Sequence, residues 1–187
     1  MTRYEEAQAV LQNADCLHDQ AAVSATFDRL ARAVRAEYTP LNPVLVCTMV
    51  GGLVPTVELI KRLNFAFELD YLHATRYRGE TTGAGLVWKA EPGTPLEGRH
   101  VLVIDDILDE GHTLAAIQGA LQAQRPASLK TLVLAEKLHK RKAPGVKAEF
   151  VGLTVPDRYV FGCGMDYKEY LRHLPAIYAV RLTGGAV

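Results

Sequence analysis

The sequence lacks a net charge, because its 187 residues include 21 lysines and arginines and 21 aspartates and glutamates. Proteins that bind nucleic acid or an anionic membrane surface through their overall field carry an excess of basic residues. The composition therefore predicts neither a nucleic-acid partner nor a membrane partner. Any anion that the protein binds has to be held by local groups.

Cysteine is also scarce, and Cys16, Cys47 and Cys163 form no Cys-x-x-Cys pair. Neither a disulfide framework nor a zinc site is indicated. The first ten residues, MTRYEEAQAV, do not resemble a secretory signal. No apolar run approaches the roughly 20 residues that a membrane span needs. We therefore expect a reduced, cytoplasmic compartment.

The composition is otherwise that of a globular protein, with 49% hydrophobic and 22% charged residues. No repeat or linker divides the chain, so we expect a single domain over residues 1–187, with a mobile loop in the stretch 78–98 that is rich in glycine, proline and threonine. Short apolar runs alternate with helical patterns, which indicates an α/β fold: a mostly parallel, twisted sheet flanked by helices. The predicted strands are 44–50, 65–72, 101–104, 129–134, 150–155 and 177–180, and the predicted helices are 23–38, 55–63 and 114–124.

Carboxylates gather after the predicted central strand, where Asp105, Asp106, Asp109 and Glu110 follow the apolar run 101–104. Open parallel sheets bind ligands beyond the carboxyl ends of their strands. Because neighbouring strand residues point to opposite faces, Asp105 and Asp106 cannot both face inward as a buried pair. At least one of them should therefore reach the ligand crevice.

Residues 109–113 lead into a helix N-terminus, where backbone N–H groups bind anions. His112 stands where a P-loop places a lysine, so this is not a nucleoside-triphosphatase loop. A sugar phosphate together with Mg²⁺ would satisfy both the N–H groups and the carboxylates. The alternative is that Asp105 and Asp106 are solvated strand ends and that Asp109 only caps a helix.

The string VLVIDDILDEGHT at residues 101–113 closely resembles the signature of type I phosphoribosyltransferases. That signature has four apolar residues, two acids, two apolar residues and then Asp-Thr-Gly-x-Thr. The resemblance implies the type I phosphoribosyltransferase fold, with a small hood built from about residues 1–20 and 156–187. It also implies that Asp105 and Asp106 bind the ribose hydroxyls of phosphoribosyl pyrophosphate (PRPP).

The same resemblance implies that the loop from Asp109 to Thr113, with Gly111 and His112, wraps the 5′-phosphate of PRPP. Glu110 stands where the family most often has threonine. Because a carboxylate would repel the phosphate, we expect Glu110 to point outward and to offer only its N–H group.

Residues 151–172 resemble one branch of the family, the hypoxanthine-guanine phosphoribosyltransferases. This resemblance implies that Tyr159 stacks on the purine and that the backbone at Val160 binds the edge of the base. Asp166 would lie near the base and the metal, and Arg172 would reach the pyrophosphate. The metal ligands implied are Asp166, Asp105 and Asp106.

Lys137 aligns with the lysine that donates to the 6-oxo group and N7 of the purine in that branch. An ammonium group has three donors and no acceptor, so it pairs with the carbonyl of hypoxanthine or guanine and not with the amino group of adenine. The alternative reading is a solvated basic run, because Lys140, Arg141 and Lys142 follow. We interpret these later three as surface residues.

Val50, Gly51 and Gly52 align with the pyrophosphate loop of the family, where small residues let backbone amides approach the leaving group. The family often has lysine at position 50, so binding here is expected to come from the main chain. The resemblance also suggests a strained Met49–Val50 peptide bond and leaves its cis or trans state open. Arg76, in a segment that aligns with the flexible loop of the family, either supplies charge to the pyrophosphate or faces solvent.

The function implied is purine salvage: Mg²⁺-dependent transfer of the 5-phosphoribosyl group from PRPP to N9 of hypoxanthine or guanine, which gives the nucleoside monophosphate and pyrophosphate. Asp109 would be the catalytic residue that handles the proton on N7, and closure of the loop 77–88 would exclude water. A homodimer or homotetramer is expected. Two alternatives stay open, a xanthine-preferring phosphoribosyltransferase and a PRPP-sensing regulator without turnover. The regulator would need a nucleic-acid surface, which this neutral chain does not indicate.

Overall fold

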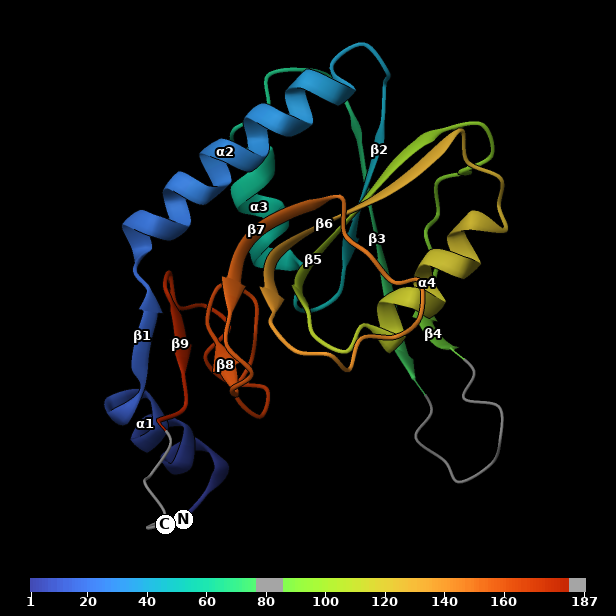
Figure 1. The fold of residues 1–187 in the computed structure, drawn as a ribbon. Coiled ribbons are helices and arrows are strands. Elements are labelled where there is room, and N and C mark those ends of the chain that lie inside the picture. Colours follow the sequence, from blue (N-terminus) through green and yellow to red (C-terminus); the bar gives the residue numbers. More distant parts are fainter. Residues whose placement is uncertain (77–85, 182–187) are drawn as a thin grey trace.

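A six-stranded sheet forms the centre of the computed structural model, which describes residues 1–76 and 86–181. The strand order is β4-β3-β2-β5-β6-β7, and all neighbours are parallel except β4, which runs antiparallel to β3 (Figure 1). The predicted α/β fold with a mostly parallel sheet is therefore confirmed. The strands are β2 Val44–Thr48, β3 Glu68–Arg76, β4 Leu86–Ala90, β5 His100–Leu108, β6 Ser128–Lys137 and β7 Phe150–Val155.

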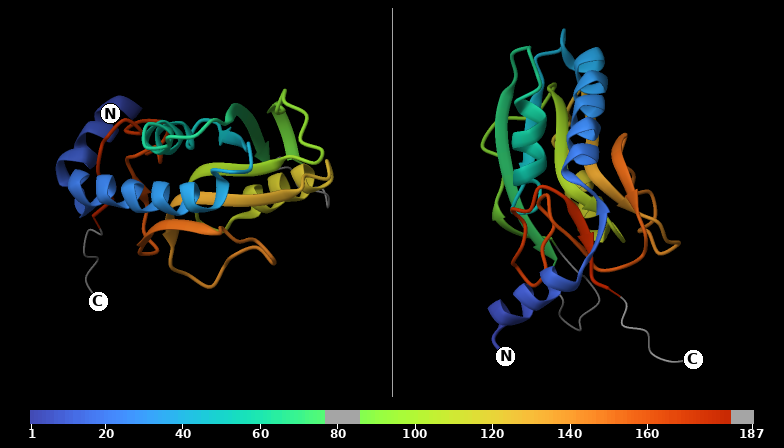
Figure 2. Two further views of the ribbon diagram at one scale, coloured as in Figure 1. Left: turned by 90° about the horizontal axis from the view of Figure 1, so that it is seen from above. Right: turned by 90° about the vertical axis from the view of Figure 1, so that its left-hand side faces the viewer.

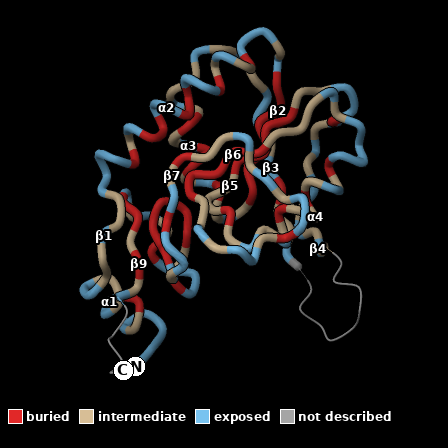
Figure 3. The backbone as a smooth tube through the Cα atoms, in the orientation of Figure 1, coloured by how far each residue is buried: buried red, intermediate tan, exposed pale blue. Residues whose placement is uncertain are grey.

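Helices cover both faces of this sheet (Figures 1 and 2). The helices α2 (Gln20–Tyr38) and α3 (Leu53–Ile60) pack on one face, and α4 (His112–Gln122) packs on the other. A strand between two such layers is buried on both sides, so its sequence is a continuous apolar run. The strand β2 is wholly buried for this reason, and Figure 3 shows buried residues gathered in the central strands.

The apolar spacing of α2 places Phe27, Leu30 and Val34 on one stripe that faces the sheet, as the helical period predicts. The helix begins after Asp19, whose carboxylate accepts a hydrogen bond from the N–H group of Ala22. This side-chain cap satisfies one of the N–H groups that lack a partner in the first turn.

A second, smaller sheet has the antiparallel order β1-β9-β8 and joins the two ends of the chain. Its strands are β1 (Asp15–His18), β8 (Val160–Phe161) and β9 (Ile177–Ala179), and α1 (Arg3–Asn13) precedes them. These segments fall within the ranges expected for the hood. The division of the chain into one domain with a hood stays a prediction.

Several predicted boundaries were wrong. The expected loop 78–98 contains the edge strand β4 and the buried Leu96, because β4 pairs with β3. Residues 77–85, which hold most of the expected closing loop 77–88, lie outside the described residues. The strand β5 continues to Leu108 because it stays paired with β6, so Asp105 and Asp106 lie within a strand rather than after it. Lys137 is likewise the last residue of β6.

In the part of the chain that the structure describes, none of the helices combines the length and the apolar character that a membrane crossing would need.

Candidate functional site

A cavity of about 290 Å³ opens at the carboxyl ends of β5 and β6. It brings together three segments that are far apart in the sequence. Its wall includes every residue that the sequence predicted for purine binding, and also the carboxylates of Asp106 and Asp109. The lining residues are Asp106, Ile107, Asp109, Lys137, Tyr159, Val160, Met165 and Asp166.

Asp105 and Asp106 point in different directions, as the alternation of a strand requires. Asp106 lines the cavity, whereas the Oδ1 atom of Asp105 lies 2.5 Å from the hydroxyl Oγ1 of Thr48 on β2. Burial raises the pKa of both carboxyl groups, and the negative charge of Asp105 raises the pKa of Asp106 further. The edge of the sheet therefore presents one carboxylate to the cavity and anchors the other one beside it.

The turn after β2 lies directly beside this pair. The Met49–Val50 peptide bond is cis, and Val50 is exposed. A Cβ atom built on Gly51 would overlap the carboxylate of Asp106, and one built on Gly52 would overlap the carbonyl oxygen of Ile104. Only glycine allows the backbone to approach β5 so closely.

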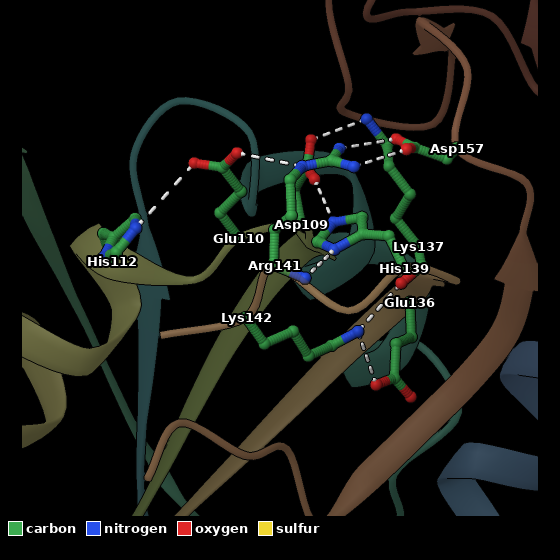
Figure 4. A network of polar contacts seen from close by, with 9 residues as sticks. All are labelled: Asp109, Glu110, His112, Glu136, Lys137, His139, Arg141, Lys142 and Asp157. Carbon is green, nitrogen blue, oxygen red and sulfur yellow. Dashed lines mark hydrogen bonds and ion pairs between the residues drawn. The ribbon is translucent and has the colours of Figure 1, made fainter. Parts of the chain in front are cut away.

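Asp109 sits at the centre of a polar network (Figure 4). Its Oδ2 atom lies 2.6 Å from Nζ of Lys137, and its Oδ1 atom lies 2.7 Å from Nε2 of His139. Partial burial acts to raise the pKa of Asp109, but the hydrogen bonds from Lys137 and His139 outweigh this effect and hold the pKa below its ordinary value. Asp109 is therefore a carboxylate at neutral pH.

The sequence missed His139, because a histidine inside a basic run is usually a surface residue. The surface interpretation holds for Lys140 and Arg141, which are exposed, and needs correction only for Lys142. Arg141 donates two hydrogen bonds to Asp157, at 2.8 and 2.9 Å. Lys142 is half-buried, and its Nζ donates to the backbone carbonyl of Lys137 at 2.8 Å and lies 3.0 Å from Oε1 of Glu136. The basic run therefore folds back against the end of β6.

The predicted phosphate loop ends at the N-terminus of α4, which begins at His112 rather than at Leu114. Gly111 caps this helix with a φ angle of +75°, in the left-handed region that favours glycine. The carboxylate of Glu110 lies 3.5 Å from Nε of Arg141 and 3.8 Å from Nε2 of His112 (Figure 4). Half of its side chain is exposed, as the outward orientation requires.

Asp166 and Arg172 form an ion pair at 2.9 Å. The other carboxylate oxygen of Asp166 accepts a hydrogen bond from the N–H group of Glu169, and the guanidinium of Arg172 also donates to the carbonyl oxygen of Gly164. Asp166 lines the cavity, and Arg172 is not among the residues of its wall. The side chain of Arg76 lies outside the described residues.

Tyr159 presents an aromatic ring to the cavity and is half exposed. Its ring centroid lies 5.2 Å from that of Tyr167 in an edge-to-face arrangement, which supports the ring from behind. An exposed, supported aromatic ring is a suitable platform for a planar ligand.

Within residues 1–76 and 86–181, no three histidine, cysteine, aspartate or glutamate side chains are arranged to hold a metal ion together. Asp106 and Asp166 nevertheless line the same cavity. Mg²⁺ in phosphate-binding sites usually takes one or two carboxylates and completes its shell with substrate oxygens and water. The residues present fit this kind of site.

The chain is similar to known proteins over most of its length. A family model described as phosphoribosyl transferase domain matches residues 13–169. The chain is 35% identical over 161 residues to the hypoxanthine-guanine-xanthine phosphoribosyltransferase of Tritrichomonas foetus. The match covers 86% of this chain and 88% of that protein. It is also 35% identical over 149 residues to the hypoxanthine-guanine phosphoribosyltransferase of Bacillus subtilis. This match covers 79% of this chain and 82% of that protein.

Solved structures agree with these relatives. A hypoxanthine phosphoribosyltransferase from Staphylococcus aureus superimposes with a TM-score of 0.86 and 29% identity, over 92% of this chain and 95% of that chain. A hypoxanthine-guanine-xanthine phosphoribosyltransferase superimposes with a TM-score of 0.83 and 31% identity, over 91% of this chain and 99% of that chain.

Proposed function

The chain belongs to the phosphoribosyltransferase family of enzymes, and we propose that it transfers the 5-phosphoribosyl group of PRPP to N9 of hypoxanthine or guanine in purine salvage. The products are the nucleoside monophosphate and pyrophosphate. The observation that carries this proposal is the single cavity that Lys137, Asp109 and Tyr159 share at the carboxyl edge of the sheet. Such an edge is the usual ligand site of an open parallel sheet.

Base recognition is assigned to Lys137, Tyr159 and Val160. Lys137 is an obligate donor at the cavity wall, so it selects a carbonyl at position 6 of the purine over an amino group. Tyr159 would offer its exposed ring for stacking, and the backbone of Val160, a residue of the cavity wall, would bind the edge of the base. The three residues together fit a planar 6-oxopurine.

The catalytic role is assigned to Asp109. Its lowered pKa keeps it ionised at neutral pH, so it can accept the proton of N7 as N9 becomes the nucleophile. The reaction at the anomeric carbon of the ribose passes through a cation-like transition state, as glycosyl transfer does generally. A nearby carboxylate also stabilises the positive charge that develops.

PRPP binding is assigned to the loops around the cavity. Asp105 and Asp106 would bind the ribose hydroxyls, and the N–H groups from Asp109 to Thr113, including those of Gly111 and His112, would bind the 5′-phosphate. The pyrophosphate would lie against the backbone of Val50, Gly51 and Gly52, with charge from Arg172 and Arg76. The close approach of Gly51 to Asp106 supports this arrangement, because it sets the pyrophosphate turn beside the ribose carboxylates.

We also propose that the reaction needs Mg²⁺. Asp166 would bind the ion with Asp106 and Asp105, and substrate oxygens would supply the remaining ligands. When bound, Mg²⁺ neutralises the charge of the departing pyrophosphate. It would also favour the ionised forms of Asp105 and Asp106, whose pKa values are raised by burial.

A xanthine-using enzyme is the second candidate, because the relative from Tritrichomonas foetus is named for xanthine as well. Xanthine keeps the 6-oxo group that Lys137 would bind and differs from hypoxanthine at position 2. The choice between the two therefore depends on groups that face position 2 and not on Lys137.

A homodimer or homotetramer is also part of the proposal. Large apolar side chains are exposed on α3 at Leu53 and Val57, and on β3 at Leu69 and Tyr71. A second copy of this chain would cover such a surface. Light scattering should therefore give at least twice the mass of 20.5 kDa, and a monomer would contradict the assembly.

The test of the proposed function is a substrate panel. The purified protein is given PRPP and Mg²⁺ with hypoxanthine, guanine, xanthine or adenine, and kcat/KM is measured for each. Hypoxanthine and guanine should be the best substrates, and adenine should be the poorest. A protein that binds PRPP without turning over any purine would be a sensor rather than an enzyme, which contradicts the proposal.

A further inference from the structure

His139 is a buried imidazole that holds the proposed catalytic carboxylate. It follows β6 by two residues, and only 3% of its side chain is exposed. Its Nε2 atom lies 2.7 Å from Oδ1 of Asp109, while Lys137 occupies Oδ2. Each of the two side chains therefore contacts a different carboxylate oxygen of Asp109 (Figure 4).

The hydrogen bond at the other ring nitrogen of His139 determines the tautomer of the ring. The backbone N–H group of Arg141 donates to Nδ1 at 3.1 Å. An imidazole nitrogen that accepts a hydrogen bond carries no proton, so the proton of this ring is on Nε2. His139 consequently donates to Asp109 and does not accept from it.

The backbone that sets this tautomer is itself fixed. Arg141 makes two hydrogen bonds to Asp157, and its Nε lies 3.5 Å from the carboxylate of Glu110. The N–H group of Ala143 donates to the carbonyl oxygen of Glu110 at 2.7 Å. The segment after β6 is therefore tied both to the loop that carries Asp109 and to the segment after β7.

We propose that His139 is a positioning residue. It keeps the Asp109 carboxylate pointed into the cavity while Lys137 binds the purine. The inference rests on the proposed function. Asp109 lies on a loop, and 42% of its side chain is exposed, so its orientation depends on its two donors. Lys137 also lines the cavity and has a base to bind, whereas His139 is outside the cavity and is free to hold Asp109 throughout the reaction.

Two variants separate this role from simple packing. In His139→Asn, the shorter amide ends near the position of Nδ1, so it accepts from Arg141 but does not reach Asp109. In His139→Gln, the amide ends near the position of Nε2 and keeps a donor for Asp109. Loss of a hydrogen bond to a charged group predicts a fall in kcat of about 10-fold or more for His139→Asn. His139→Gln should keep most of the wild-type kcat, and both variants should keep the wild-type KM for PRPP.

The pH profile gives a second readout. The titratable groups that face Asp109 are Lys137 and His139, and the carboxyl groups of Asp106 and Asp166 line the same cavity. Removal of one donor raises the pKa of Asp109, so the acid limb of kcat/KM should move to higher pH in His139→Asn and stay in place in His139→Gln. The carboxyl ¹³C resonance of Asp109, followed by NMR, reports the same change without turnover.

The outcomes separate the two proposals. A wild-type protein that makes no nucleotide from any purine overturns the proposed function. An active wild type whose His139→Asn variant keeps both kcat and the acid limb overturns the role of His139. Equal losses in both variants with lowered melting temperatures show that the ring only fills space, which also overturns it. A loss confined to His139→Asn, at an unchanged melting temperature, supports it.

Discussion

Gly51 and Asp106 approach each other so closely that a Cβ atom on Gly51 would occupy the position of the Asp106 carboxylate. The contact joins the turn after β2 to the end of β5, which are the two places assigned to pyrophosphate and ribose. A side chain at position 51 would therefore have to displace either the turn or the carboxylate.

Gly51→Ala should lower kcat/KM by roughly 100-fold, the effect of moving a positioning group by about 1 Å. The measurement is steady-state kinetics with PRPP varied. Gly119→Ala is a matched control, because a Cβ atom at that position on α4 meets nothing within 4 Å. The control should keep full activity and gain about 1 kcal/mol of stability from the helix propensity of alanine. Wild-type kinetics in Gly51→Ala would show that this contact is dispensable.

Asp106→Asn should make the protein more stable and less active. Because burial and the charge of Asp105 raise the pKa of Asp106 in the folded state, the folded protein binds this proton more tightly than the unfolded chain does. The wild type therefore loses stability as the pH rises above the unfolded pKa of this group, and the asparagine variant lacks this loss. The gap between the two melting temperatures should widen from pH 4 to pH 7, and a constant gap would contradict the raised pKa.

Lys137→Gln should reduce kcat/KM for hypoxanthine and guanine by about 10- to 150-fold, because it removes a charged hydrogen bond worth roughly 1.5–3 kcal/mol. Discrimination against adenine should weaken, since an amide can also accept a hydrogen bond from an amino group. The affinity for PRPP alone, measured by calorimetry, should stay near the wild-type value. The ion pair with Asp109 is lost as well, so some of the fall will appear in kcat.

Lys140→Gln is the control for this variant, because Lys140 belongs to the same basic run and is exposed. It should behave as the wild type does. If Lys140→Gln abolished purine use while Lys137→Gln did not, the residue that recognises the base would be misassigned. If neither variant had an effect, the 6-oxo assignment would lose its main support.

Asp109→Asn tests the proton-transfer step. Loss of a general acid–base group predicts a fall in turnover of about 10²- to 10⁴-fold. PRPP binding should be largely kept, because the N–H groups of the phosphate loop are unchanged. Single-turnover kinetics at saturating PRPP would isolate the effect on chemistry, and a turnover near that of the wild type would reduce Asp109 to a structural residue.

The sequence predicted the main sheet because its strands are buried on both faces and therefore appear as short apolar runs. It missed α1, although Thr2 and Glu5 form a capping box that is a recognised start signal. It also missed β4, a short edge strand with alternating burial inside a stretch rich in glycine and proline. The strand β4 is held by its pairing with β3, which only the tertiary structure reveals.

The residues proposed to bind the purine were predicted through family resemblance, and the structure places Lys137, Tyr159 and Asp166 in one cavity. His139 was beyond reach, because its importance depends on a hydrogen bond across 30 residues to Asp109. The ion pairs of Arg141 and Lys142 depend in the same way on how the chain folds back after β6. A basic run in a sequence does not show which of its members are turned inward.

The central claim is phosphoribosyl transfer to a 6-oxopurine, and product analysis after mixing the protein with PRPP, Mg²⁺ and hypoxanthine tests it most directly. The account predicts that inosine monophosphate and pyrophosphate appear in equal amounts, that formation stops when a chelator removes divalent metal, and that it resumes when Mg²⁺ is restored. No nucleotide in the presence of Mg²⁺, or full turnover without any divalent metal, would contradict the account.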